Sequence, residues 1–280
     1  MPLPPRGATG QGEAEWEDPE MVWKKLFASV GVGGASVDTV LHEPNVVPGG
    51  VVHGEVRIAG GAVEQTVQSL SVGFLARVEV ERDDGEVKKD IEFARQRIGG
   101  ELRLSEGAVH TVPFALEVPW ETPLTVLTGH RLPGMEIGVT TELALAKAVD
   151  SGDLDPVHVH PLPAQQALLD AFLGLGFRFK SADLEQGVVR NTRQRLPFYQ
   201  EVEFHAPPQY RGLREVEVTF VADDREMDVV LEMDKKPGLF SEGSDSYHAF
   251  RVGLANFAST DWAGYLNRWI SEVSGRRNWL

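Results

Sequence analysis

The feature that most constrains the fold of this chain is a succession of runs in which apolar and polar residues alternate. Such runs extend over residues 36–42, 51–58, 70–80, 87–98, 111–118 and 135–145. Turn signals rich in Gly, Pro and Asp separate them, among them Pro48-Gly49-Gly50 and Leu132-Pro133-Gly134. Because a period of two indicates strands and no helical pattern interrupts the series, these residues predict an antiparallel β-sandwich.

The pattern changes at Pro161-Leu162-Pro163. Beyond this point Ala164, Leu168, Phe172 and Leu175 fall on one helical face, which predicts a linker helix of about three turns at the boundary. Alternation then resumes over residues 177–184, 198–205, 213–221, 227–233 and 247–254. The sequence therefore predicts an all-β protein with a few short helices, built from two β-sandwich domains in tandem.

The ends of the chain differ from this body. Residues 1–20 are expected to form a disordered acidic tail, and a short helix beginning at Asp18-Pro19-Glu20 is expected to lead into the first sandwich. We place the N-terminal domain at residues 21–160 and the linker helix with the second sandwich at 161–257. An amphipathic helix is predicted over residues 258–280.

That C-terminal helix carries a strongly apolar stripe. Its members are Trp262, Tyr265, Leu266, Trp269, Ile270 and Val273. Because large apolar side chains are worth roughly 1.5–3 kcal/mol each when buried, water is an unfavourable surrounding for this face. Three alternatives follow: docking on the chain's own second sandwich, pairing with a second copy in a homodimer, or contact with a different protein.

Composition limits the class of partner. The formal net charge is −15, which repels phosphate backbones and anionic membrane surfaces, so we expect no nucleic-acid partner and no stable membrane insertion. The chain has no cysteine, which removes disulfides and fits a reducing cytoplasm. No signal-peptide pattern and no run of about 18 apolar residues is visible, so we expect a soluble cytoplasmic protein.

Motifs for catalysis or cofactors are weak. His158 and His160 lie two apart on a predicted strand and share a face, but a metal site needs further ligands, so ordinary strand histidines are the better interpretation. Asp150, Asp153 and Asp155 lack calcium-loop spacing and are interpreted as a polar loop between strands. We therefore expect no cofactor, no metal and no catalytic residues.

Several stretches taken together resemble a known family. They are WKKLFASVGVGGASVDTVL (23–41), VVPGGVVHGEVRIAGGAVEQ (46–65), VPFALEVPWETPLT (112–125), LALAKAVDSGDLDPVHVHP (143–161), LPFYQEVEF (196–204) and LREVEVTFVADDREMDVVLEMDKKPGLF (213–240). In order and spacing they are similar to the bacterial sporulation-control proteins of SpoOM type, over residues 21–240. The tail before this range and the segment after it fall outside the similarity.

The resemblance implies two arrestin-like sandwiches and a cytoplasmic regulator of developmental timing that does not catalyse a reaction. An adaptor or scaffold that binds other proteins is the first hypothesis. A β-sandwich enzyme, or a protein that binds a small ligand or a metal, is the alternative. Polar contacts between the halves can fix their orientation in such a fold, and Asp38 and Asp234 are the candidates for these contacts; facing solvent is the alternative for both.

Overall fold

The computed structural model describes residues 34–82, 85–235 and 246–275. The predicted acidic tail and the predicted leading helix lie outside these residues. Strands dominate the described part of the chain, accompanied by two α-helices and one short 3-10 helix. The predicted all-β class with a few short helices is therefore confirmed.

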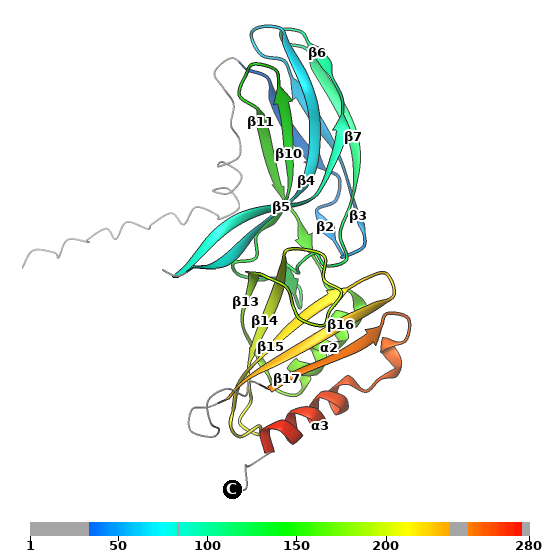
Figure 1. The fold of residues 1–280 in the computed structure, drawn as a ribbon. Coiled ribbons are helices and arrows are strands. Elements are labelled where there is room, and N and C mark those ends of the chain that lie inside the picture. Colours follow the sequence, from blue (N-terminus) through cyan, green and yellow to red (C-terminus); the bar gives the residue numbers. More distant parts are fainter. Residues whose placement is uncertain (1–33, 83–84, 236–245, 276–280) are drawn as a thin grey trace, which may run out of the picture.

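The N-terminal half is a sandwich of two sheets (Figure 1). Strands β1, β3 and β7 form one sheet, and β11, β10 and β4 form the other, with β5 and β6 paired to β4. Alternate residues of both sheets, such as Val56, Phe74, Leu116 and Leu143, are buried between them. The strands of this half are β1 (Ser36–Leu41), β2 (Asn45–Val46), β3 (Val51–Ala59), β4 (Gln65–Arg82), β5 (Gly85–Gly99), β6 (Leu102–Leu104), β7 (Val109–Glu117), β8 (Val126–Leu127), β9 (His130–Arg131), β10 (Ile137–Leu145), β11 (Ser151–Pro156) and β12 (His158–Val159).

Strand β11 corrects the expectation that Asp153 and Asp155 lie, with Asp150, in a polar loop between strands; Asp150 precedes the strand. Asp153 and Asp155 are only 6% and 8% exposed, and they point into the sandwich rather than into solvent. The Asp153 carboxylate accepts a hydrogen bond from the Thr39 backbone N–H at 2.7 Å, and the Thr39 hydroxyl meets that of Thr141 at 2.7 Å. Polar side chains of β11 therefore face the interior, where Asp153 bonds β1. Because apolar residues normally take the inward positions of a strand, the sequence of β11 resembles that of a loop.

Strand β4 links the two halves of the molecule. Its first part pairs with β10, and its later part continues with β5 as a long hairpin that leaves the sandwich (Figure 1). At Glu79 it meets Glu185 of β13 in a parallel bridge. One continuous sheet therefore runs from the N-terminal sandwich into the C-terminal half.

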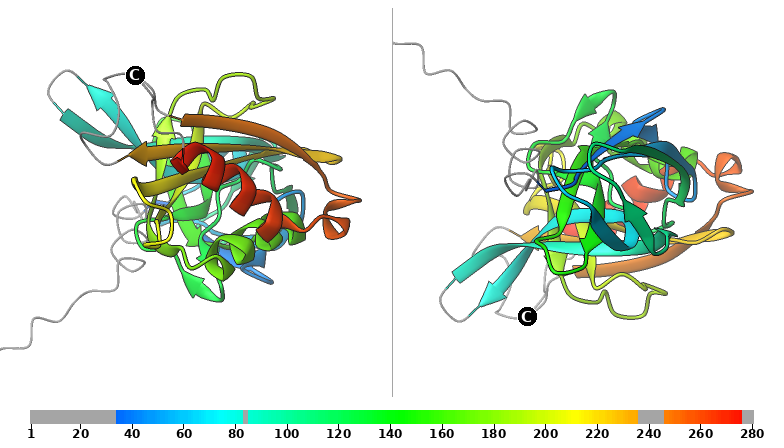
Figure 2. Two further views of the ribbon diagram at one scale, coloured as in Figure 1. Left: turned by 90° about the horizontal axis from the view of Figure 1, so that it is seen from below. Right: turned by 90° about the horizontal axis from the view of Figure 1, so that it is seen from above.

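The C-terminal half contains one antiparallel sheet with helices on one side (Figure 2). The sequence predicts a second sandwich here; among the described residues, α2 and α3 supply the second layer instead. Their apolar faces cover the buried face of the sheet, as a second sheet does in a sandwich. The elements are α2 (Pro163–Gly174), β13 (Arg178–Gln186), β14 (Phe198–His205), β15 (Leu213–Ala222), β16 (Glu226–Lys235), β17 (Ser246–Gly253), the 3-10 helix η1 (Phe257–Ser259) and α3 (Trp262–Gly275).

The linker helix forms as predicted. Helix α2 begins with Pro163 at its first position, and the Gln165 side chain accepts a hydrogen bond from the Leu162 N–H at 2.8 Å. Leu168 and Phe172 are fully buried, and Phe172 stacks on Phe204 of β14 with ring centroids 5.5 Å apart. The helix therefore packs mainly on the C-terminal sheet, with Gln165 at its start facing the junction between the halves.

Candidate functional site

The two halves meet where residues 118–125, here called the junction segment, contact the loop of residues 187–197 between β13 and β14. The key side chain is Glu121. Its carboxylate accepts hydrogen bonds from the backbone N–H of Arg195 at 2.8 and 2.9 Å and from that of Leu196 at 2.9 Å. A carboxylate that binds two adjacent N–H groups fixes a loop as an anion does in a backbone nest.

A second polar contact lies deeper in the junction. Gln200 of β14 is buried, and its amide bonds both backbone groups of Leu124: it accepts from the N–H at 2.8 Å and donates to the carbonyl at 2.8 Å. The same nitrogen lies 3.1 Å from the sulfur of Met135. The Gln200 side chain thus satisfies both backbone groups of Leu124, as the backbone of a neighbouring strand would, and fixes the junction segment in place.

The Pro48-Gly49-Gly50 turn supports this segment from the other side. Gly49 has φ +74°, and a Cβ placed on it would lie 2.5 Å from the ring of Trp120. Glycine is needed here both for the left-handed backbone and for the close approach of the indole. The turn therefore positions Trp120 next to Glu121 at the junction.

The loop of residues 187–197, which we call the arginine loop, is organised by its own side chains. Gln194 accepts from the Val189 N–H at 2.8 Å and donates to the carbonyls of Gly187 and Leu196 at 2.8 Å each. Asn191 occupies the left-handed region at φ 62°, which asparagine tolerates better than most residues. This ordering holds the backbone N–H groups that Glu121 binds.

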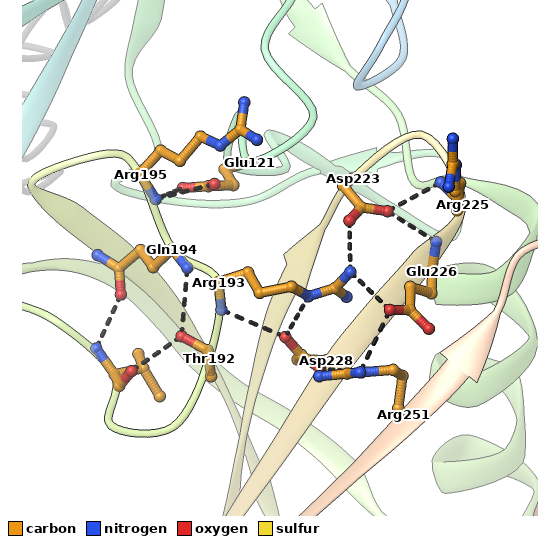
Figure 3. A network of polar contacts seen from close by, with 11 residues as sticks. Glu121, Thr192, Arg193, Gln194, Arg195, Asp223, Arg225, Glu226, Asp228 and Arg251 are labelled. Atoms are coloured by element: carbon orange, nitrogen blue, oxygen red, sulfur yellow. Dashed lines mark hydrogen bonds and ion pairs between the residues drawn. The ribbon is translucent and has the colours of Figure 1, made fainter.

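Arg193 ties the arginine loop to the C-terminal sheet (Figure 3). Its guanidinium pairs with Asp223, with Glu226 at 2.7 Å and with Asp228 at 3.1 Å, and Arg251 of β17 pairs with Asp228 at 2.8 Å. We call these five residues the Arg193 cluster. Burial alone would raise the pKa of Asp228, but the hydrogen bonds from Arg251 and Arg193 lower it below its usual value.

A contrasting group of charges covers the neighbouring part of the same sheet face, which we call the acidic face. Asp183 lies opposite Glu201, Glu203 lies opposite Glu217, and Glu217 lies opposite Glu232. Like charges at such cross-strand positions repel. The full set is Glu79, Asp183, Glu185, Glu201, Glu203, Glu215, Glu217 and Glu232, all half-buried.

Two carboxyl groups of the acidic face have raised pKa values. Burial, followed by repulsion from Glu203 and Glu185, raises the pKa of Asp183 to about 7. Burial and repulsion from Glu217 and Asp183 raise the pKa of Glu201 to about 8. Lys180 offsets part of the charge at one side, where its ammonium group bonds Glu203 at 2.5 Å and Glu215 at 2.7 Å. Near neutral pH this face therefore exchanges protons with solvent.

The sequence suggests Asp38 and Asp234 for contacts between the two halves. Asp38 is exposed on β1, opposite Arg57 of the same sheet. The backbone of Asp234 lies in β16 opposite Glu215, and its side chain lies outside the described residues. The exposure of Asp38 fits the solvent-facing alternative, and the junction contacts are made by Glu121 and Gln200.

The apolar stripe of α3 lies against its own half. Leu266 and Ile270 are fully buried, and Trp262, Tyr265, Trp269 and Val273 are half-buried against the same core. His248 of β17 stacks on Trp269 with ring centroids 4.6 Å apart, and burial lowers its pKa. Of the three alternatives for this stripe, the structure shows docking on the chain's own C-terminal half.

The two candidate histidines lie at β12 and directly after it. His160 contacts the side chain of Asn45, with its Nε2 3.0 Å from the amide oxygen, and His158 belongs to β12. Within the described ranges, no group of three or more His, Cys, Asp or Glu side chains is arranged to hold a metal ion. No described helix has the length and apolar character needed to cross a bilayer.

Sequence reasoning missed Glu121, Gln200 and Arg193. Glu121 and Gln200 act on backbone groups of residues about 75 positions away, which no local pattern reveals. A signal did exist for Arg193: residues 186–200 contain three arginines and no acidic residue in a chain of net charge −15. Such a local reversal of charge indicates that the segment meets acidic neighbours.

Comparisons with known proteins match this architecture. The family model described as SpoOM protein matches residues 23–237. The sporulation-control protein spo0M of Bacillus subtilis (strain 168) is 33% identical over 216 residues, which cover 76% of this chain and 81% of that protein. The crystal structure of Spo0M from Bacillus subtilis superposes with a TM-score of 0.74 at 27% identity, covering 86% of this chain and 99% of that one. The chain therefore belongs to the SpoOM protein family.

Proposed function

We propose that this protein is a cytoplasmic regulatory adaptor that acts through protein–protein contacts rather than through catalysis. The binding of its partners would depend on the contacts that hold the two halves together. The observation that carries the proposal is the junction, where Glu121 and Gln200 join the halves through a few hydrogen bonds to backbone groups. A contact of this size can be altered by a partner whose binding contributes a few kcal/mol.

The family supports a regulatory role, because its curated member from Bacillus subtilis is named a sporulation-control protein. The absence of cysteine from the chain fits a reducing compartment. The acidic net charge argues for protein partners rather than nucleic acid or an anionic membrane.

A replacement at the junction tests the proposal. The chromosomal copy in the native host is exchanged for Glu121→Ala or, as a control, for Glu106→Ala, whose side chain is exposed in the turn between β6 and β7. After crosslinking in cells, we expect the wild type and the control to recover the same partners in the same amounts. Glu121→Ala should change recovery of at least one of them about ten-fold.

Equal recovery with all three versions would contradict a junction-dependent adaptor. Turnover of a small-molecule substrate by the purified chain, unchanged in Glu121→Ala, would favour the enzyme alternative instead.

A further inference from the structure

Two clefts open on either side of Trp120. One has a volume of about 270 Å³, and its lining includes the apolar residues Trp120, Leu196 and Ala222. The other has a volume of about 380 Å³ and continues past Pro119 to Val51, whose exposed fraction is 45%. The two clefts share only Pro119 and Trp120, and Glu117 lines the second. The first lies between the junction segment and the arginine loop, and we call it the groove.

The charged groups of the groove differ in what they already bind. Glu121 accepts from the backbone N–H groups of Arg195 and Leu196, and Arg193 pairs with Asp223, Glu226 and Asp228. The Arg195 side chain is exposed, and in Figure 3 no dashed line reaches its guanidinium, whereas its backbone nitrogen is bonded to Glu121. Among the described side chains, no ion pair engages this guanidinium, so it is free to bind an anion at the rim of the groove.

We propose that the groove binds an extended, acidic segment of a partner protein. An apolar side chain of that segment packs against Trp120 and Leu196, and a carboxylate one or two residues away pairs with Arg195. Trp and Arg are the residue types that most often dominate interface energetics, and guanidinium–carboxylate pairs are both strong and directional. The inference rests on the proposed adaptor role and names the chemistry of its partner.

Charge complementarity argues for this occupant. The charged residues that line the groove are Glu121, Arg193, Arg195 and Asp223. Arg193 pairs with Asp223, and Glu121 accepts from backbone N–H groups, so Arg195 is the charge that remains for a ligand. A basic segment would be repelled by Arg195 at the groove and attracted to the acidic face elsewhere. The chain's own residues 13–20, EAEWEDPE, have the same acidic and aromatic character and are the competing occupant.

A random library of 12-residue peptides, displayed and selected on the purified full-length protein, tests the proposal. We expect the selected peptides to be enriched in Glu or Asp next to Trp, Phe or Leu. Their affinity should fall at least ten-fold for Arg195→Gln and for Trp120→Phe, and should stay within two-fold for the control Arg211→Gln, which replaces an exposed arginine elsewhere. Because Arg195 is exposed, Arg195→Gln is expected to melt like the wild type, so loss of binding reports the groove itself.

Three results would overturn the proposal. The first is selection of peptides whose binding ignores Arg195→Gln and Trp120→Phe. The second is selection of basic or uncharged peptides at the groove. The third is a ten-fold gain in affinity when residues 1–20 are deleted, because the chain's own tail would then be the occupant. The adaptor role is tested separately, by partner recovery with Glu121→Ala. A negative result for peptide binding at the groove therefore leaves the proposed adaptor role intact.

Discussion

The Arg193 cluster and the acidic face lie on one face of the same sheet, and their carboxylates are stabilised in opposite ways, by arginines in the first and by protons in the second. Asp228 and Glu232 are four residues apart on β16 and point to the same side. Asp228 receives two arginines, whereas Glu232 lies opposite Glu217. The pKa of Asp228 is lowered and that of Glu201, next to Glu217 across the sheet, is raised. Burial favours the neutral form of both carboxylates; repulsion from Glu217 adds to it at Glu201, whereas the hydrogen bonds from Arg251 and Arg193 outweigh it at Asp228.

The comparison also separates two roles. The Arg193 cluster anchors the arginine loop, whose backbone Glu121 binds, so it contributes to the junction between the halves. The acidic face includes Glu79 of β4 and Glu185 of β13, the pair at which the shared sheet passes from one half to the other. Ion pairing thus holds one side of the connection, while proton binding relieves repulsion at the other.

The largest effect is expected from Arg193→Met. The change leaves Asp228, whose side chain is 9% exposed, with Arg251 alone, and deprives Asp223 and Glu226 of their shared cation. Asp228 is the buried member of the network and the others are partly exposed, so solvent screening reduces the loss to about 2 kcal/mol. Thermal unfolding should show a melting temperature roughly 4–8 °C lower. Arg190→Met removes an exposed arginine of the same loop and should change stability by less than about 0.5 kcal/mol; equal losses for the two variants would contradict the distinct role of Arg193.

Glu121→Ala should have a smaller effect. It leaves the backbone N–H groups of Arg195 and Leu196 without their acceptor, which should cost about 1–2 kcal/mol. Because the arginine loop is then released from the N-terminal half, limited proteolysis should cut within residues 187–197 faster than in the wild type. Glu106→Ala is the control, and a cleavage rate equal to that of the control would show that the loop does not depend on this carboxylate.

Glu201→Gln should stabilise the protein in alkaline solution. The pKa of Glu201 is about 8 in the folded protein and lies near 4.5 when the chain is unfolded, so the folded state binds more protons between these values. Its contribution to stability is therefore present in full below pH 4.5 and is lost as the pH rises through 8. The variant should be about 1 kcal/mol more stable than the wild type at pH 8.5, a value reduced for solvent screening, and equal to it at pH 4. Denaturant unfolding at both pH values checks this, and a variant less stable than the wild type at pH 8.5 would refute it.

The smallest effect concerns salt. Screening weakens repulsion between half-exposed carboxylates, so 0.5 M NaCl should stabilise the wild type at pH 8.5 by roughly 0.3 kcal/mol more than it stabilises Glu201→Gln. Unfolding curves of the two proteins at low and high salt provide the measurement. An equal salt response would mean that repulsion from Glu201 is negligible.

The sequence predicts the strands of the main sheets well, because alternation and turn residues are local signals. Strand β14 occupies residues 198–205, as expected, and α2 covers Pro163–Gly174, close to the helix over 164–173 that the apolar spacing predicts. Strand β11 was missed because Asp153 faces inward to bond Thr39, a contact between residues more than 100 positions apart. The second sandwich was predicted wrongly because alternation reveals that a sheet has a buried face but not what covers it, and here α2 and α3 do so.

The candidate site was less predictable than the fold. The stripe of α3 is visible in the sequence because its spacing is helical, although its docking surface is not. The acidic face is hidden, since Asp183, Glu201 and Glu217 come from three strands and alternate with apolar residues as any solvent-facing set does. Only the register of the strands brings these carboxylates together.

Titration of individual carboxyl groups by carbon-detected NMR tests the contrast between the two clusters most directly. The ionisation of Glu201 should occur near pH 8 and that of Asp183 near pH 7, while Asp228 should ionise below its usual pKa of 3.8. Ionisation of Glu201 and Asp183 near 4, or of Asp228 well above 4, would contradict the assignment of repulsion to the acidic face and ion pairing to the Arg193 cluster.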